Sequence, residues 1–256
     1  MTIDFPTASL VPQMRALWQE AFGDTEEYLD TFFETGYDPC RAMCAVQDGV
    51  VLSAVYWLRC TLRGQKVAYL YALATAKAYQ GRGIAHKLMD AVHTTLQQQG
   101  YAGAILVPGN EKLFAFYEPM GYRHRTKVTE FFCAGAADEV QLRRINVDAF
   151  LAQRRELLSF LEEGGVLQED ENMALLATQA NFYAGQNFLL AARAEGDTLI
   201  GLELLGDAQT APGILQSLGY ASGKFRTRGN GTDFAVYRPL GDSEPAPPTY
   251  FGLAFD

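Results

Sequence analysis

The chain opens with apolar residues whose spacing changes from strand-like to helical. "TIDF" predicts a short strand. The apolar residues that follow recur at helical spacing up to Gly23, a typical helix stop. They are Leu10, Met14, Leu17 and Ala21. A second helix is expected from about residue 24 to residue 35.

Two apolar runs then flank a tight turn in "AMCAVQDGVVLSAVYWL". Asp48 followed by Gly49 is the strongest short hairpin signal, so these runs predict two antiparallel strands. "KVAYLYALAT" predicts a third strand beside them. Tyr69 and Tyr71 are two positions apart in that strand, so both tyrosines are expected on the same face.

A glycine-containing turn follows, and after it comes a helix with one apolar stripe. Its apolar residues fall four positions apart and are Ile84, Leu88, Val92 and Leu96. The helix is expected to end at Gly100. "GAILV" then predicts a strand, "EKLFAFYEPM" a short helix and "GYRHRTKVTEFFC" a closing strand or hairpin. This order predicts an α+β fold, with an α/β mixed sheet and one crossover helix.

The second half resembles a shorter copy of the first. The linker "AGAADE" separates residues 1–134 from residues 139–240, where "FLLAARAEGDTLIGLELL" repeats the hairpin and "LQSLGYASGKF" repeats "YEPMGYRHR". On this interpretation the copy lacks the third strand, the glycine turn, its helix and the next strand. Residues 241–256 are a Pro-rich tail, for which a solvated end is expected and docking of its aromatic residues is the alternative.

Composition narrows the class of protein. At 256 residues with 48% hydrophobic content, the chain is long enough for one large core or two modest ones. A net charge of -9 and a pI near 4.9 argue against nucleic-acid binding. The sequence shows no apolar run of about 18 residues and no signal-peptide pattern, so we expect no membrane span and a cytoplasmic location. Its four cysteines and three histidines form no zinc-binding spacing, so no metal is expected.

The turn at residues 80–85 is a candidate anion site. A turn that leads into a helix presents unpaired backbone N–H groups at the positive end of the helix dipole. Gly81 and Gly83 allow the backbone to approach a ligand closely, and Gln80 and Arg82 offer side-chain donors. The dinucleotide fingerprint does not fit because its third glycine and the later acidic residue are missing, and the chain contains no Walker loop.

The sequence "QGRGIA" in this turn resembles the Q/R-x-x-G-x-G/A motif of the GNAT acetyltransferase superfamily. "NEKLFAFYEPMGY", residues 110–122, is similar to the Asn, Tyr and Gly-aromatic pattern of the same family. The predicted order of elements is also the family's order. The resemblance covers roughly residues 1–134, with weaker similarity to about residue 240. It implies the acyl-CoA N-acyltransferase (GNAT) fold, followed by a degenerate second copy that binds no cofactor.

The resemblance implies an acetyl-CoA-dependent N-acetyltransferase that transfers the acetyl group directly to a primary amine of a small acceptor. Acetyl-CoA is then the cosubstrate. The residues that the resemblance assigns to it are Leu73, Ala74, Thr75, Gln80, Gly81, Arg82, Gly83, Ile84, Ala85 and Asn110. A non-catalytic acyl-CoA binding or sensing module is the alternative, and a longer acyl donor is a third reading. The second half is expected to shape the acceptor pocket or to form a homodimer face.

Tyr117 is placed by the motif to protonate the leaving thiolate. Many relatives carry a glutamate on the third strand as the general base, and Tyr69 stands at that position here. Because a tyrosine is a poor base at neutral pH, the alternatives are a water relay, no efficient base, or a helix carboxylate. The candidate carboxylates are Glu26, Glu27 and Asp30. The three histidines are interpreted as surface or structural residues, and they are His86, His93 and His124.

Overall fold

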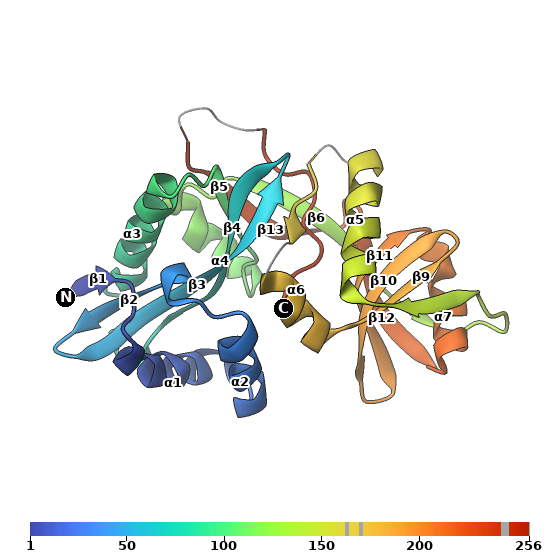
Figure 1. Ribbon diagram of the computed structural model, residues 1–256, viewed down its shortest axis with the longest axis horizontal. Coiled ribbons are helices and arrows are strands. Elements are labelled where there is room, and N and C mark those ends of the chain that lie inside the picture. Colours follow the sequence, from blue (N-terminus) through green and yellow to red (C-terminus); the bar gives the residue numbers. More distant parts are fainter. Residues whose placement is uncertain (162–163, 169–170, 242–245, 256) are drawn as a thin grey trace. The chain divides into compact units, whose positions relative to one another are not determined.

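The structure is a computed structural model that describes residues 1–161, 164–168, 171–241 and 246–255 (Figure 1). The chain divides into two compact units. The first unit comprises Met1–Arg123, Glu169–Leu175 and Val236–Pro245. The second comprises His124–Gln168, Leu176–Ala235 and Ala246–Asp256.

These units differ from the predicted boundaries of 1–134, 139–240 and 241–256. A short stretch near residue 170 and the end of the last strand belong to the first unit, whereas the predicted closing strand belongs to the second. The physical reason is strand pairing over long sequence distances, which the local pattern does not encode.

The first unit is a mixed sheet with helices on both faces. Its strands lie in the order β1-β2-β3-β4-β5-β13, and only β4 and β5 run parallel. The strands are β1 (Thr2–Asp4), β2 (Ala42–Gln47), β3 (Val50–Leu62), β4 (Gln65–Thr75), β5 (Gly103–Leu106) and the second half of β13 (Thr232–Pro239). The α-helices are α1 (Val11–Phe22), α2 (Glu26–Thr35), α3 (Ile84–Gln98) and α4 (Glu111–Tyr117). The 3-10 helices are η1 (Ala8–Leu10), η2 (Pro39–Arg41), η3 (Lys77–Tyr79) and η4 (Glu118–Met120).

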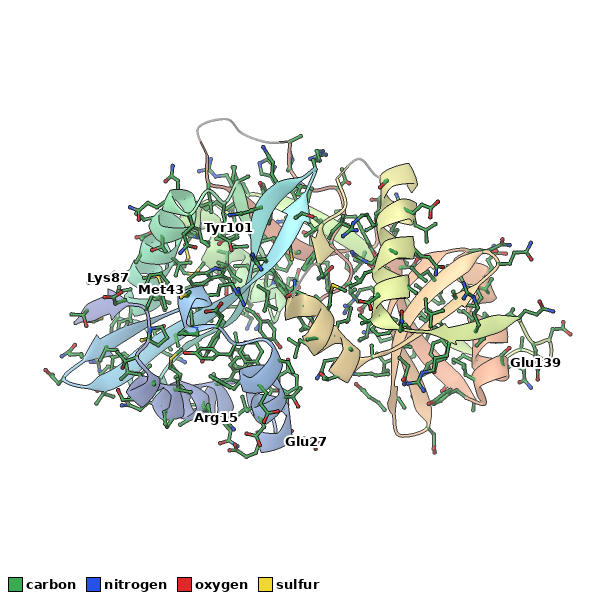
Figure 2. All side chains as sticks on the ribbon, in the orientation of Figure 1. Arg15, Glu27, Met43, Lys87, Tyr101 and Glu139 are labelled. Atoms are coloured by element: carbon green, nitrogen blue, oxygen red, sulfur yellow. The ribbon has the colours of Figure 1, made fainter. Side chains whose placement is uncertain are left out.

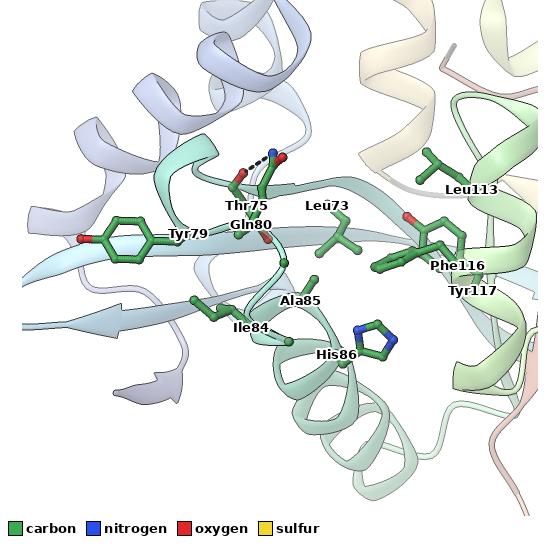
Figure 3. A pocket seen from close by; sticks show the side chains of 12 residues that line it. Leu73, Thr75, Tyr79, Gln80, Ile84, Ala85, His86, Leu113, Phe116 and Tyr117 are labelled. Atoms are coloured by element: carbon green, nitrogen blue, oxygen red, sulfur yellow. Dashed lines mark hydrogen bonds between the residues drawn. The ribbon is translucent and has the colours of Figure 1, made fainter.

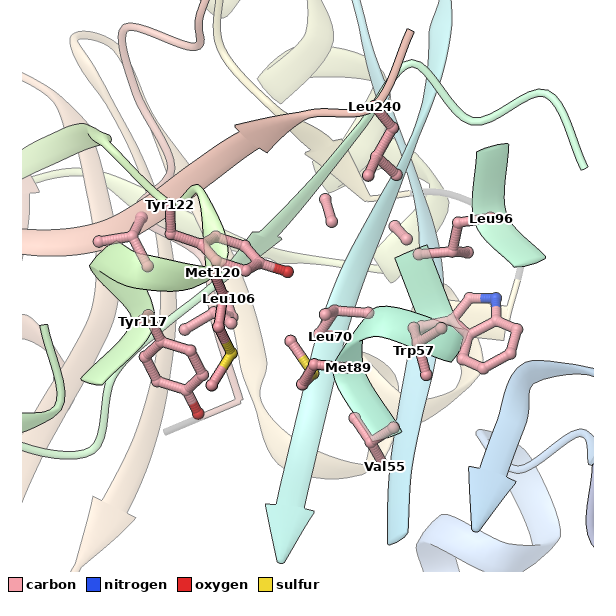
Figure 4. Packing of buried hydrophobic residues seen from close by; sticks show 14 of the residues in the cluster. Val55, Trp57, Leu70, Met89, Leu96, Leu106, Tyr117, Met120, Tyr122 and Leu240 are labelled. Atoms are coloured by element: carbon pink, nitrogen blue, oxygen red, sulfur yellow. The ribbon is translucent and has the colours of Figure 1, made fainter. Parts of the chain in front are cut away.

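Both faces of β3 and β4 are buried, because alternate residues of each strand pack against different helices. Trp57 and Leu70 belong to the core cluster that contains three residues of the apolar stripe of α3, namely Leu88, Val92 and Leu96 (Figure 4). On the other face, Tyr56 lies 5.0 Å from Trp18 of α1, measured between ring centroids. Phe32 of α2 lies 4.6 Å from the same tryptophan. The helical stripe and the strand pattern seen in the sequence are therefore both confirmed.

The strand that completes the first sheet comes from the far end of the chain. Val236 pairs with Leu106, and Pro239 pairs with Gly103, so β13 runs antiparallel to β5. A Cβ atom on Gly103 would clash with the ring and hydroxyl of the buried Tyr237, so the glycine leaves the space that this side chain fills. The expected closing strand, β6 (His124–Ala134), pairs with β12 (Ser222–Arg228) of the second unit instead.

The second unit follows the same order of pairing. Its strands lie in the order β13-β6-β12-β11-β10-β9-β7; β11 runs parallel to β12, whereas the pairs β12-β6, β10-β11, β10-β9 and β7-β9 are antiparallel. The strands not yet named are β7 (Leu142–Ile145), β8 (Leu167–Gln168), β9 (Asn181–Gly185), β10 (Phe188–Glu195) and β11 (Thr198–Gly206). The helices are α5 (Val147–Leu161), η5 (Ala208–Thr210), α7 (Ala211–Leu218) and the second half of α6 (Glu171–Gln179), whose first residues belong to the first unit.

Helix α7 connects two parallel strands, as α3 does in the first unit. The expectation that the second half lacks a third strand and a crossover helix is therefore wrong. What differs is the turn before the helix. Thr210 precedes α7 and a proline lies in its first turn, where α3 has a glycine pair.

The aromatic end of the chain is buried in the second unit, contrary to the expected solvated terminus. Tyr250 is 2% exposed, and its hydroxyl donates to Glu203 Oε1 at 2.9 Å. Glu203 also accepts from Arg154 Nε at 2.6 Å, and both charged side chains are fully buried. Arg154 donates further to the carbonyl of Val166 at 3.1 Å. A paired and hydrogen-bonded charge cluster thus holds this segment. Residues 242–245 and 256 of the predicted tail lie outside the described residues.

Among the helices that the structure describes, none is long and apolar enough to span a membrane.

Replacing Glu203 by glutamine should lower the free energy of unfolding by about 3 kcal/mol, because it leaves the buried Arg154 guanidinium without a counter-charge. Urea unfolding of the full chain, followed by circular dichroism, measures this loss. Glu195→Gln is the matched control. It removes a partly exposed pair with Arg193 at 2.9 Å and should change the stability by less than about 1 kcal/mol. Equal losses in the two variants would contradict the structural role of the buried pair.

Candidate functional site

An irregularity in β4 opens the sheet at its centre. Ala54 pairs with Ala74 and Tyr56 with Tyr71, so two residues of β4 oppose one residue of β3. This is a β-bulge, and Ala72 within it has a positive φ of 51°. The parallel pairing of β4 with β5 ends at Tyr69. Beyond that residue, β4 continues to Thr75, past the end of its pairing with β5. Backbone groups of this segment are thereby directed toward the gap.

The glycine turn follows directly and ends at an uncapped helix. Gly81 has a φ of 74°, and Gly83, the N-cap residue of α3, has a φ of 72°. No side chain caps the first N–H groups of α3. A Cβ atom built on either glycine would meet no other atom within 4 Å, so the space over the turn is open. The predicted arrangement of free amides at a helix N-terminus is therefore present.

The two polar side chains of the turn support its own backbone. Gln80 Nε2 donates to the carbonyl of Thr75 at 3.0 Å (Figure 3). Arg82 Nη2 donates to the carbonyl of Ala78 at 2.9 Å, and its guanidinium lies over the ring of Tyr79 at 5.1 Å. In this conformation, both side chains stabilise the turn.

A cavity of about 580 Å³ lies between the end of β4, the turn, the start of α3 and α4 (Figure 3). The predicted site residues that line it are Leu73, Thr75, Gln80, Gly81, Gly83, Ile84, Ala85 and Tyr117. Its volume is within the range of small-molecule sites. The structure thus brings together residues from both motifs, which are separated by about 25 positions in the sequence.

Four predicted residues do not line this cavity. Ala74 is 5% exposed, and its carbonyl accepts from Ser53 Oγ at 2.7 Å. The side chain of Arg82 packs on the ring of Tyr79 and donates to the carbonyl of Ala78, and it does not line the cavity. Asn110 is exposed, and its Oδ1 accepts from the backbone N–H of Lys112 at 3.1 Å, so this side chain caps α4. The fourth residue, Tyr69, is described below.

Sequence reasoning missed four residues of the cavity wall, which are Tyr79, His86, Leu113 and Phe116. The edge of the His86 ring packs against Phe116, with centroids 5.0 Å apart and planes at 77°. Its position in the first turn of α3 was a usable signal, because side chains there flank an N-terminal ligand. The spacing of seven residues to His93 suggested one shared face, but His86 is exposed whereas His93 is buried.

Tyr117 lies at the end of α4 with its ring largely buried. It is 8% exposed, and its ring packs edge-on against Phe116 at 5.1 Å and Tyr122 at 5.7 Å. Burial raises the pKa of Tyr117 to about 12. The phenol therefore stays protonated at neutral pH and is available as a hydrogen-bond or proton donor to a group in the cavity.

Tyr69 lies on the opposite face of the strand from the α3 core. It is 2% exposed, and its ring lies 5.8 Å from that of Tyr71, so the two tyrosines share a face as predicted. The hydroxyls of Tyr71 and Tyr28 are 2.6 Å apart. Burial, followed by the nearby Tyr28 and Tyr69 phenols, raises the pKa of Tyr71 well above its usual value. This environment disfavours the phenolate form of Tyr71.

The candidate helix carboxylates lie on the outer surface of α2. Arg15 Nη2 is 3.0 Å from Glu26 Oε2 and 2.6 Å from Asp30 Oδ1. Side chains of both acids are more than half exposed. Glu27 points outward from the first turn of α2 (Figure 2). Their exposure and their pairing with Arg15 weaken the case for any of the three as the general base.

In the described part of the chain, no group of three or more histidine, cysteine, aspartate or glutamate side chains is arranged to hold a metal ion.

Comparison with known proteins places this site in a family. Residues 2–125 match the family model described as an acetyltransferase (GNAT) domain. No curated protein matches the chain by sequence.

Solved structures share the fold over almost the whole chain. A GCN5-related N-acetyltransferase from Kribbella flavida has a TM-score of 0.71 at 16% identity, over 93% of this chain and 70% of that one. A GCN5-related N-acetyltransferase from Anabaena variabilis has a TM-score of 0.68 at 13% identity, over 95% of this chain and 74% of that one. Together with the match at residues 2–125, these findings confirm the predicted fold. Residues 2–125 therefore match an acetyltransferase (GNAT) domain, and the chain shares its fold with these N-acetyltransferase structures.

Proposed function

We propose that this protein is an acetyl-CoA-dependent N-acetyltransferase that transfers the acetyl group directly to a primary amine of a small acceptor. The observation that carries the proposal is the junction of three features at one cavity. These features are the edge of β4 beyond its pairing with β5, the uncapped start of α3 and the buried phenol of Tyr117.

The residues present fit coenzyme A. The pyrophosphate carries negative charge, and the free amides that follow Gly83 lie at the positive end of a helix of 15 residues. Open space over Gly81 and Gly83 leaves room for close approach of phosphate oxygens. The backbone of Leu73 and Thr75 would pair with the amides of the pantetheine arm. Apolar wall residues such as Phe116 suit the methylene groups of that arm.

Acetyl-CoA would supply the acetyl group as an activated thioester. Backbone N–H groups near Leu73 would orient the carbonyl and stabilise negative charge on its oxygen. Tyr117 would donate a hydrogen bond or proton to the sulfur as the thiolate leaves. For the base we favour a water relay, because Tyr69 is buried and Arg15 pairs with two of the three candidate carboxylates.

Asn110 and Ala74 have support roles in this proposal. Asn110 caps α4 and thereby holds the helix that carries Tyr117. Ser53 donates to the carbonyl of Ala74, which fixes the strand beside the bulge. Arg82 would contribute its backbone amide, while its side chain stays on the turn.

The second unit is proposed to be a degenerate copy that binds no coenzyme A. Its pairing order repeats that of the first unit, but the turn before α7 lacks the glycine pair and carries a proline in the first helical turn. Titration should therefore find one site in each chain. The small acceptor, the homodimer and the cytoplasmic location remain predictions.

A second candidate function is a non-catalytic acyl-CoA binding or sensing module. Tyr69 favours it, since this phenol stands where many relatives carry a glutamate base and lies in a buried position. Such a module would bind acetyl-CoA without releasing free thiol in the presence of amines.

Calorimetric titration should show saturable binding of acetyl-CoA and of CoA at one site per chain, and no binding of NAD. Gly83→Glu should weaken acetyl-CoA binding by about 100-fold or more, because it sets a carboxylate against phosphate. Gly83→Ala is the matched control, since it shares the strain of the positive φ without the charge, and it should retain most of the binding. Similar losses in the two variants would assign the effect to strain instead of to phosphate recognition.

Tyr117→Phe should keep the Kd for acetyl-CoA within about two-fold while it lowers kcat by about 100-fold, which is a typical effect of losing a general acid. Thiol release with acetyl-CoA and a panel of spermidine, kanamycin and L-lysine measures kcat. Because burial raises the pKa of Tyr117 to about 12, the protonated donor persists throughout ordinary assay conditions. Between pH 6 and pH 10, kcat should therefore show no decline that is caused by this phenol. A decline in that range that disappears in Tyr117→Phe would contradict the assignment.

A further inference from the structure

A buried chain of hydrogen bonds lies behind Tyr117 and joins three distant parts of the sequence. Arg238 of β13 lies with its Nη1 2.7 Å from His93 Nδ1 on α3. His93 Nε2 in turn is 2.8 Å from the hydroxyl of Tyr122. His93 is 4% exposed and Tyr122 is 1% exposed. The proposed chemistry above makes no use of these three residues.

The arginine determines which way the hydrogen bonds run. A guanidinium can only donate, so Nδ1 of His93 accepts and carries no proton. Burial, together with the charge of Arg238, lowers the pKa of His93 to about 3, so the ring is neutral. Its single proton is therefore on Nε2, and this N–H donates to the oxygen of Tyr122. The network selects one tautomer and one ring orientation.

The same network fixes the turn that follows Tyr117. Arg238 Nη1 also donates to the carbonyl of Met120 at 2.6 Å. The side chain of Arg238 packs over Gly121, whose φ is 91° and whose Cβ position lies 3.2 Å from Arg238 Cδ. The backbone N–H of Tyr122 lies 3.4 Å from the carbonyl of Tyr117, and their rings pack edge-on at 5.7 Å. The phenol of Tyr117 is thus supported by a side chain that Arg238 and His93 hold in place.

We propose that Arg238, His93 and Tyr122 are positioning residues that hold Tyr117 at the reacting thioester. The inference rests on the proposed function of Tyr117 as the acid. Arg238 lies outside residues 2–125, the part that matches the family domain. The strand that returns after the second unit therefore completes the catalytic apparatus as well as the sheet. A domain cut after residue 125 would lack this support.

A second cavity makes the arginine accessible to a chemical test. It has a volume of about 340 Å³, and its lining includes Arg238, His93, Thr94, Gln97 and Leu240. Because this cavity borders the guanidinium, removal of the Arg238 side chain enlarges a space that a small guanidinium ion can enter. Guanidinium chloride at low millimolar concentration is the probe for this space.

The first experiment measures the histidine tautomer in the full chain, independently of any activity. Two-dimensional NMR of ¹⁵N-histidine-labelled protein should show His93 as a neutral ring with the proton on Nε2 from pH 6 to pH 9. In the Arg238→Met variant, His93 Nδ1 no longer accepts a hydrogen bond from the guanidinium. The His93 signals should therefore shift toward those of a mixture of the two neutral tautomers. Arg123→Met, which removes an exposed arginine next to Tyr122, should leave the His93 signals unchanged. A wild-type His93 protonated on Nδ1 would overturn the network.

The second experiment measures turnover in a double-mutant cycle with the panel amine that reacts fastest. Arg238→Met and Tyr122→Phe should each lower kcat by about 10-fold, with the Kd for acetyl-CoA unchanged, because a misplaced catalytic group slows the chemical step. Arg238→Lys should recover part of this loss, and guanidinium should raise kcat of Arg238→Ala but not of Arg123→Ala. In the Tyr117→Phe background, Arg238→Met should cause no further loss, since it acts through the missing phenol.

The outcomes separate the two proposals. A wild-type chain that turns over none of the amines contradicts the proposed function, while the NMR result still decides whether the network exists. A full 10-fold loss for Arg238→Met in the Tyr117→Phe background, or a matching loss of acetyl-CoA affinity, overturns the positioning role. Circular dichroism melting curves identify any variant that has unfolded, and for such a variant the Arg238→Lys substitution supplies the deciding measurement.

Discussion

The extra residue at the bulge of β4 is the constraint on which the site depends. Two residues of β4 oppose one residue of β3, and Ala72 adopts a φ that is unfavourable for any residue with a Cβ atom. The pairing of β4 with β5 stops at Tyr69, although β4 continues for six residues. A regular strand would keep these backbone groups in the sheet. The bulge instead leaves them beside the glycine turn, where the cavity forms.

Burial of uncharged polar groups is the second principle of this site. Desolvation raises the pKa values of Tyr117 and Tyr71, and it lowers that of His93. All three groups therefore stay neutral around pH 7, and none of them needs a counter-charge inside the first unit. Charge is placed differently in the second unit, where Arg154 and Glu203 form a fully buried pair that holds the C-terminal segment. The first arrangement keeps the two phenols protonated as hydrogen-bond donors, and the second stabilises the fold.

Exchange of the last strands links the fold to the proposed chemistry. Strand β6 follows Tyr117 in sequence but pairs in the second unit, and β13 completes the first sheet. Arg238 reaches His93 and the carbonyl of Met120 only because β13 returns to this position. A strand that follows the second unit in sequence thus completes the sheet of the first unit. Its own helix α7 starts without the glycine pair that suits phosphate.

Local patterns in the sequence determined most of the elements of the first unit. The hairpin at Asp48 and Gly49, the stripe of α3 and the uncapped glycine turn all follow from interactions between residues close in the chain. The glycine turn and the Tyr117 motif together predicted six residues of the cavity wall, and the family resemblance added Leu73 and Thr75 at the end of the third strand. The net charge of -9, which the sequence alone determines, argues against a broad surface for nucleic acid.

Tertiary structure alone decided the features that depend on distant residues. Both β6 and β13 have strand-like sequences. Their partner strands depend on contacts between residues far apart in the chain, such as the packing of Tyr237 against Gly103. His86 and His93 are seven positions apart on α3, so the sequence pattern does not distinguish them. Only the packing of β13 and Tyr122 against α3 buries His93 and keeps its ring neutral. The docking of Tyr250 depended on the buried charge of Glu203, which lies 47 positions earlier. Periodicity reports which face of an element is apolar, whereas the identity of the partner on that face is a property of the folded chain.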